Sequence, residues 1–97
     1  MSKDAKDRFP VLRDFARGYL HQDVVPEYGS PLKAASVYFA DLGDEERRQL
    51  SREASKMERA AKPWDLDTVN RTLAEMGAAV VLSSTEEFFQ ILKVFRH

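Results

Sequence analysis

Residues 19–30 of the chain have the sequence YLHQDVVPEYGS, and this stretch separates two helical patterns. Before it, Leu12, Phe15 and Tyr19 recur at helical spacing. After it, Ser30-Pro31 is typical of a helix start, because Ser can cap the first turn and Pro needs no N–H there. The linker itself carries two tyrosines, a histidine, an amide, two carboxylates and a glycine. A linker of this composition indicates either a functional site or a turn with demanding geometry.

The remaining chain shows the same helical spacing of apolar residues. We expect five helices, over roughly residues 9–20, 30–42, 44–62, 65–76 and 84–96. The segment 78–83 is too short for a helix and is expected to be an extended connector or one isolated strand. These patterns predict an all-α fold, a compact bundle of about five helices. The expected single domain spans residues 9–97, after a solvated N-terminal tail over residues 1–8.

The composition limits the classes of function. The 97 residues include 15 basic and 16 acidic side chains, for a net charge of −1, so nucleic acid and anionic membranes are not expected partners. No cysteine is present, which rules out disulfides and cysteine catalysis. The N-terminus lacks the apolar core of a signal peptide, and no apolar run approaches the roughly 18 residues of a membrane span. We therefore expect a cytoplasmic protein.

Catalytic and metal-binding patterns are sparse. The two histidines are His21 and His97, and a metal site needs three or four suitable ligands. We therefore expect no metal and no cofactor. His21 and Asp23 could form an acid–base pair, but no phosphate-binding loop or nucleophile motif accompanies them. The chain is thus predicted not to be an enzyme, and a small enzyme using His21 and Asp23 is the less favoured alternative.

The expected third helix carries five basic side chains on one broad face, and acidic residues fall among them. The basic residues are Arg47, Arg48, Arg52, Lys56 and Arg59. Glu53 and Glu58 interrupt this run, and Glu58 is placed to pair with Lys62 four residues later. A mixed pattern of this kind is typical of a solvated helix surface. A DNA-binding helical domain is accordingly not favoured.

The linker and the helix after it resemble a known family. The residues that carry the resemblance are Tyr19, His21, Gln22, Asp23, Tyr28, Gly29 and Ser30, followed by Ala34, Ala35 and Phe39. They are similar to the α-helical immunity proteins of contact-dependent growth inhibition and related bacterial polymorphic-toxin systems. The resemblance implies a cytoplasmic bacterial protein that binds and neutralises one cognate toxin domain, often a nuclease, by stoichiometric occlusion without chemistry. It also implies that the shared motif is structural.

A surface that contacts the toxin should then lie outside the motif, since specificity requires contact residues that differ between partners. Two groups of acidic residues are candidates, because acids can mimic the phosphates that a basic nuclease site binds. The first group lies at the junction of the second and third helices and consists of Asp41, Asp44, Glu45 and Glu46. The second group lies on or near the fourth helix and consists of Asp65, Asp67 and Glu75. Compensation of helix dipoles also explains part of the first group.

The expected partner is the C-terminal domain of the cognate toxin. The alternative is a generic helical interaction module or adaptor. Phe89 and Val94 broaden the apolar face of the last helix, so the unbound protein is expected to be a monomer or a weak homodimer.

Overall fold

The computed structural model describes residues 8–21 and 27–96. Five helices are fully described, and the described residues contain no strand, which confirms the predicted all-α fold. Most of the expected tail, as well as Gln22, Asp23 and His97, lies outside the described residues. The helices are α2 (Pro10–Tyr19), α4 (Pro31–Asp41), α5 (Asp44–Ala61), α6 (Leu66–Glu75) and α7 (Thr85–Phe95).

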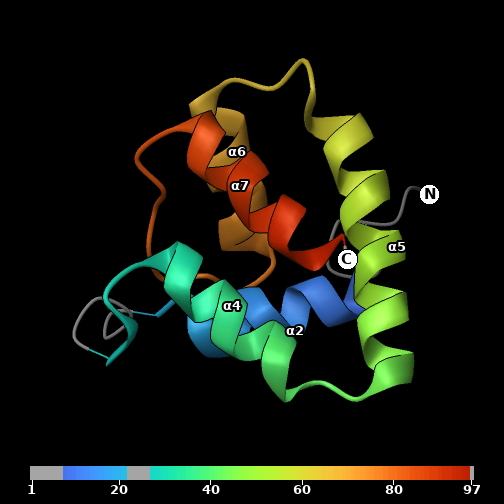
Figure 1. Cartoon of the computed structure of the whole chain (residues 1–97). Coiled ribbons are helices and arrows are strands. Elements are labelled where there is room, and N and C mark those ends of the chain that lie inside the picture. Colours follow the sequence, from blue (N-terminus) through green and yellow to red (C-terminus); the bar gives the residue numbers. More distant parts are fainter. Residues whose placement is uncertain (1–7, 22–26, 97) are drawn as a thin grey trace.

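The last helix occupies the centre of the bundle. α7 packs against α4, α5 and α6, while α2 packs against α4 and α5 (Figure 1). The buried side chains of α7 recur at helical spacing: Phe88, Ile91, Leu92 and Phe95. A helix surrounded in this way needs a broad apolar face, and Phe89 and Val94 supply the additional contacts with the core.

The buried faces of α5 and α6 follow the helical spacing of their apolar residues. The apolar stripe of α5 is fully buried and consists of Leu50, Ala54, Met57 and Ala61. On α6, Val69 and Leu73 are buried and Met76 follows them into the core, whereas Leu66 is only half-buried. Trp64, in the turn after α5, is half-buried and packs against the core.

The connector of residues 78–83 forms no strand and is held by two other segments. The Ala79 N–H donates to the Leu20 carbonyl at 2.7 Å, just after the end of α2. The side-chain amide of Asn70 brackets Leu82: it accepts from the Leu82 N–H at 2.7 Å and donates to the Leu82 carbonyl at 3.1 Å. The connector is therefore held by one backbone hydrogen bond to Leu20 and by two hydrogen bonds with the Asn70 side chain.

Two helix ends depend on specific residues. Gly77, after α6, has φ +106°, and a Cβ there would approach the Arg17 Cβ to 3.1 Å, so the position requires glycine. The Ser84 hydroxyl accepts from the Glu87 N–H at 3.1 Å and so caps the start of α7. The Glu87 carboxylate bonds to Ser83 instead of completing the capping box at Ser84.

Candidate functional site

The tyrosines of the family motif belong to a continuous aromatic cluster. The rings of Tyr19 and Tyr28 stack with centroids 5.6 Å apart, which joins the two sides of the linker. Tyr19 also contacts Tyr38 at 4.9 Å, and Tyr38 contacts Phe15 at 5.4 Å. Phe15 in turn meets Phe95 edge to face at 5.1 Å. The motif tyrosines therefore connect the linker to the core.

The remaining described motif residues shape the start of α4. Gly29 has φ +91°, a conformation that other residues resist, and the Ser30 hydroxyl accepts from the Lys33 N–H at 3.1 Å. His21 is half-buried and follows Leu20 at the end of α2. These contacts agree with a structural role for the motif. The proposed partner of His21 in an acid–base pair, Asp23, is among the residues that are not described.

The first acidic group forms one exposed corner, which we call the acidic junction: Asp41, Asp44, Glu45 and Glu46. A two-residue linker brings the end of α4 to the start of α5, so the four residues lie close together (Figure 1). Glu46 accepts from the Gly43 N–H at 3.5 Å, and Asp44 lies 3.9 Å from Arg47 with its side chain 90% exposed. Asp41 and Glu45 make no hydrogen bond or ion pair within the described part of the chain.

The second acidic group is not one patch. Asp65 caps α6 by accepting from the Thr68 N–H at 2.9 Å, and this hydrogen bond lowers the pKa of its carboxyl group. Asp67 pairs with Arg71 at 2.9 Å on the exposed surface. Glu75 ends the helix, about 12 Å further along its axis at 1.5 Å per residue. The structure therefore keeps Asp65 and Asp67 together and separates Glu75 from them.

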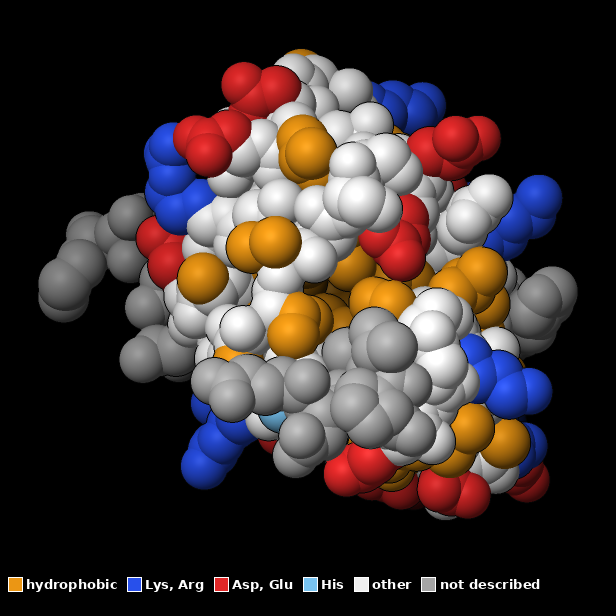
Figure 2. Space-filling model, turned by 90° about the vertical axis from the view of Figure 1, so that its left-hand side faces the viewer, with side chains coloured by type: hydrophobic (Ala, Val, Ile, Leu, Met, Phe, Trp, Pro, Cys, Tyr) orange, Lys and Arg blue, Asp and Glu red, His pale blue; other side chains and the backbone are white. Residues whose placement is uncertain are grey.

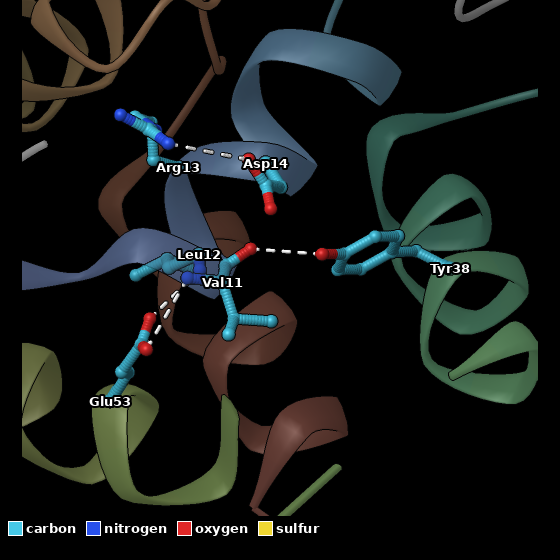
Figure 3. Close-up of polar contacts among 6 residues, drawn as sticks. All are labelled: Val11, Leu12, Arg13, Asp14, Tyr38 and Glu53. Atoms are coloured by element: carbon cyan, nitrogen blue, oxygen red, sulfur yellow. Dashed lines mark hydrogen bonds and ion pairs between the residues drawn. The ribbon is translucent and has the colours of Figure 1, made fainter. Parts of the chain in front are cut away.

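Glu53 is the main surprise, because the sequence suggested a solvated residue among basic neighbours. It is only 3% exposed. Its carboxylate accepts from the backbone N–H groups of Leu12 at 2.8 Å and Val11 at 3.3 Å (Figure 3). It also accepts from the side-chain amide of Gln49 at 2.8 Å. The prediction that Glu53 interrupts an exposed charged face is thus wrong. The carboxylate caps the N-terminus of α2 from a neighbouring helix.

A second hydrogen bond holds the same turn of α2 from its other side. The Tyr38 hydroxyl donates to the Val11 carbonyl at 2.9 Å (Figure 3). Burial raises the pKa of this hydroxyl, so it remains a donor throughout the ordinary pH range. The first turn of α2 is therefore fixed from α5 by Glu53 and from α4 by Tyr38.

Arg47 has the complementary role at the end of α4. Its guanidinium donates to the Phe39 carbonyl at 3.0 Å and to the Ala40 carbonyl at 2.8 Å. It also lies over the Phe39 ring, 5.5 Å from the centroid. The last turn of α4 has no basic residue of its own, and Arg47 supplies the positive charge that this helix end favours.

Glu58 does not pair with Lys62, which was the expectation from their spacing. Both of its carboxylate oxygens accept from one guanidinium nitrogen, Nη1 of Arg96, at 2.9 and 2.8 Å, just beyond the end of α7. A contact between residues so distant in sequence has no signal in helical spacing. It ties α5 to the end of α7.

One open groove of about 350 Å³ lies between α4 and α7 and is lined by Leu32, Ser36, Gln90, Lys93 and Val94. On another face, apolar side chains gather in a hollow (Figure 2). That view looks at the left side of Figure 1, where the connector of residues 78–83 runs and carries Val81, 74% exposed.

The part of the chain that the structure describes contains no cluster of three or more histidine, aspartate or glutamate side chains arranged to hold a metal ion. None of its helices is both long and apolar enough to cross a membrane.

The fold and the surface together define a small all-α protein that exposes carboxylates at a helix junction. The family described as CdiI immunity protein matches residues 8–93. The match covers most of the sequence, and the chain belongs to this family, as the resemblance of the linker predicted. No curated protein and no solved structure shows a significant match.

Proposed function

We propose that the chain neutralises one cognate toxin of contact-dependent growth inhibition by binding its C-terminal domain in the cytoplasm. The domain of residues 9–97 would form a stoichiometric complex that blocks the toxin without enzymatic chemistry. The proposal extends membership of the CdiI immunity protein family to a specific mechanism. The preferred target is a nuclease, whose basic active site would accept carboxylates in place of phosphates.

The observation that carries this proposal is the exposure of the acidic junction. All four of its side chains are exposed, and Asp41 and Glu45 are not used by any hydrogen bond or ion pair within the described residues. Carboxylates of this kind attract a basic surface and speed its encounter with the protein. The family motif, in contrast, packs its tyrosines into the aromatic cluster. Asp65 and Asp67 remain a second candidate contact, whereas Glu75, which lies at the other end of α6, is not proposed as one.

The test measures affinity for the inactivated C-terminal domain of the proposed cognate toxin. Reversing Asp41 and Glu45 together to Lys should weaken binding by about tenfold or more, because like charges would then oppose each other in the complex. Glu46 is left intact because it bonds to Gly43. Isothermal titration calorimetry gives the affinity and the stoichiometry, and growth during toxin expression gives the neutralisation.

One matched control, a double variant on other helices, separates binding from helix stability. Glu86 lies in the first turn of α7 as Glu45 does in α5, and Glu75 ends α6 as Asp41 ends α4. Glu75→Lys/Glu86→Lys therefore makes the same changes to helix dipoles elsewhere. Equal affinity for the two double variants would reject the acidic junction as the contact. Failure of the wild-type chain to bind the toxin domain would reject the proposed function itself.

A further inference from the structure

The outward face of α5 is more uniform in charge than its sequence suggests. Five basic side chains on it are exposed and define what we call the basic stripe: Arg48, Arg52, Lys56, Arg59 and Lys62. At 100° per residue they fall within a sector of roughly 120° around the helix. Lys62 keeps helical backbone angles just after the last residue of α5, so it continues this face.

The two acids that interrupt this run in the sequence are removed from the stripe in the fold. Glu53 is buried, and its carboxylate accepts hydrogen bonds from the N-terminus of α2. Glu58 forms its ion pair with Arg96, through both carboxylate oxygens, and not with Lys62, so its charge is neutralised. No acidic side chain therefore separates the basic residues between Arg48 and Lys62 on the exposed side of α5.

The same sector begins with the opposite charge. Asp44 and Glu45, in the first turn of α5, project from the same side of the helix as the basic stripe. The exposed face of α5 thus changes from negative to positive along a length of about 27 Å, from residue 44 to residue 62 at 1.5 Å per residue. That length is comparable to the width of a standard protein–protein contact, which covers about 800 Å² on each partner.

We propose that the basic stripe is the second half of the toxin-binding surface and binds an acidic zone of the toxin domain next to the zone that meets the acidic junction. This inference rests on the proposed function. A partner with zones of both signs complements the whole face of α5, whereas a uniformly negative nucleic acid would be repelled by Asp44 and Glu45. The net charge of −1 also favours a protein partner over nucleic acid.

The test variant is Arg48→Glu/Lys56→Glu. Neither side chain makes a hydrogen bond or ion pair within the described residues, so the fold should tolerate the change. Arg52 is left intact because it donates to Gln49, which in turn bonds to Glu53. The control is Lys33→Glu/Lys93→Glu, which changes the net charge equally at exposed positions on α4 and α7.

Affinity is measured with the inactivated toxin domain in low and in physiological salt. We expect the stripe variant to bind at least about tenfold more weakly than the control, mainly through slower association, with a smaller difference as salt rises. Thermal melting confirms that both variants are folded. Equal affinity of stripe variant and control, with intact wild-type binding, would overturn this inference and leave the proposed function standing.

Two further outcomes are informative. A short DNA duplex is offered to the wild-type chain and to the stripe variant. Tight binding to the wild type alone, with a steep dependence on salt, would identify the stripe as a nucleic-acid surface and overturn the inference. Absence of wild-type binding to the toxin domain would overturn the proposed function and this inference together.

Discussion

Two glutamates of α5, about two helical turns apart, differ in their burial and in their hydrogen bonds. Glu53 is buried, and its carboxylate accepts three hydrogen bonds, from Val11, Leu12 and Gln49. Glu45 is exposed at the acidic junction and bonds to none of the described residues. A charged residue of this helix is therefore structural where it faces the end of a neighbouring helix. Elsewhere it remains accessible to a partner.

The largest effect on stability is expected at Glu53. Glu53→Ala removes the acceptor of two N–H groups in the first turn of α2 and leaves a cavity, so it should lower the free energy of unfolding by about 2–4 kcal/mol. Urea denaturation followed by circular dichroism measures this loss. Glu53→Gln keeps one carbonyl oxygen and the shape of the side chain, and should lose less. A change below about 0.5 kcal/mol for Glu53→Ala would show that the buried carboxylate is not structural.

The sequence did contain a signal for Glu53. The residue lies three positions after Leu50 and four before Met57, which places it on the buried face of α5. In addition, α2 has no capping side chain at Phe9 and no acid in its first turn. An uncapped helix start and an acid on a buried stripe together predict capping from another helix. The helices and their apolar faces could be predicted because helical periodicity is local.

Contacts between distant segments could not be predicted in this way. The pair of Glu58 with Arg96 and the bracket of Leu82 by Asn70 depend on how the helices are placed in space. The candidate site shows the same limit. The four residues of the acidic junction are neighbours in sequence and lie together, whereas Glu75 shares only a helix with Asp65 and is separated from it by the length of α6. The basic stripe became visible only when the fold had removed the acids within it.

The next largest effect is expected at Arg47, the cationic counterpart of Glu53. Arg47→Met removes the two donors to the carbonyls of Phe39 and Ala40 and should lower the free energy of unfolding by about 1 kcal/mol, because the side chain is partly exposed to water. Arg47→Lys keeps the charge but not the planar pair of donors, so its free energy of unfolding should lie between those of the wild type and Arg47→Met. Thermal melting of the wild type, Arg47→Met and Arg47→Lys measures the order of their stabilities. Equal melting temperatures would show that Arg47 does not contribute to stability and is instead one of the charged residues that remain accessible to a partner.

A smaller effect, dependent on pH, is expected at Asp65. The hydrogen bond from Thr68 lowers the pKa of this carboxyl group in the folded protein. Its contribution to stability is therefore complete above its unfolded pKa, near 3.9, and is lost as the pH falls through the lower folded value. Asn at this position caps a helix without titrating. As the pH is lowered from 7 to 3, the melting temperature of the wild type should fall more than that of Asp65→Asn. A difference between the two melting temperatures that stays constant with pH would contradict this prediction.

The smallest effect on stability is expected where the charges are accessible. Glu45→Gln and Lys56→Gln each remove one exposed charge that bonds to no described residue, and each should change the free energy of unfolding by less than about 0.5 kcal/mol. Both should nevertheless weaken binding of the toxin domain, since they remove one charge from each zone of α5. Denaturation and calorimetry on the same samples separate the two properties. A loss of stability close to that of Glu53→Ala would mean that the outer face of α5 also holds the fold, and the distinction between the two glutamates would fail.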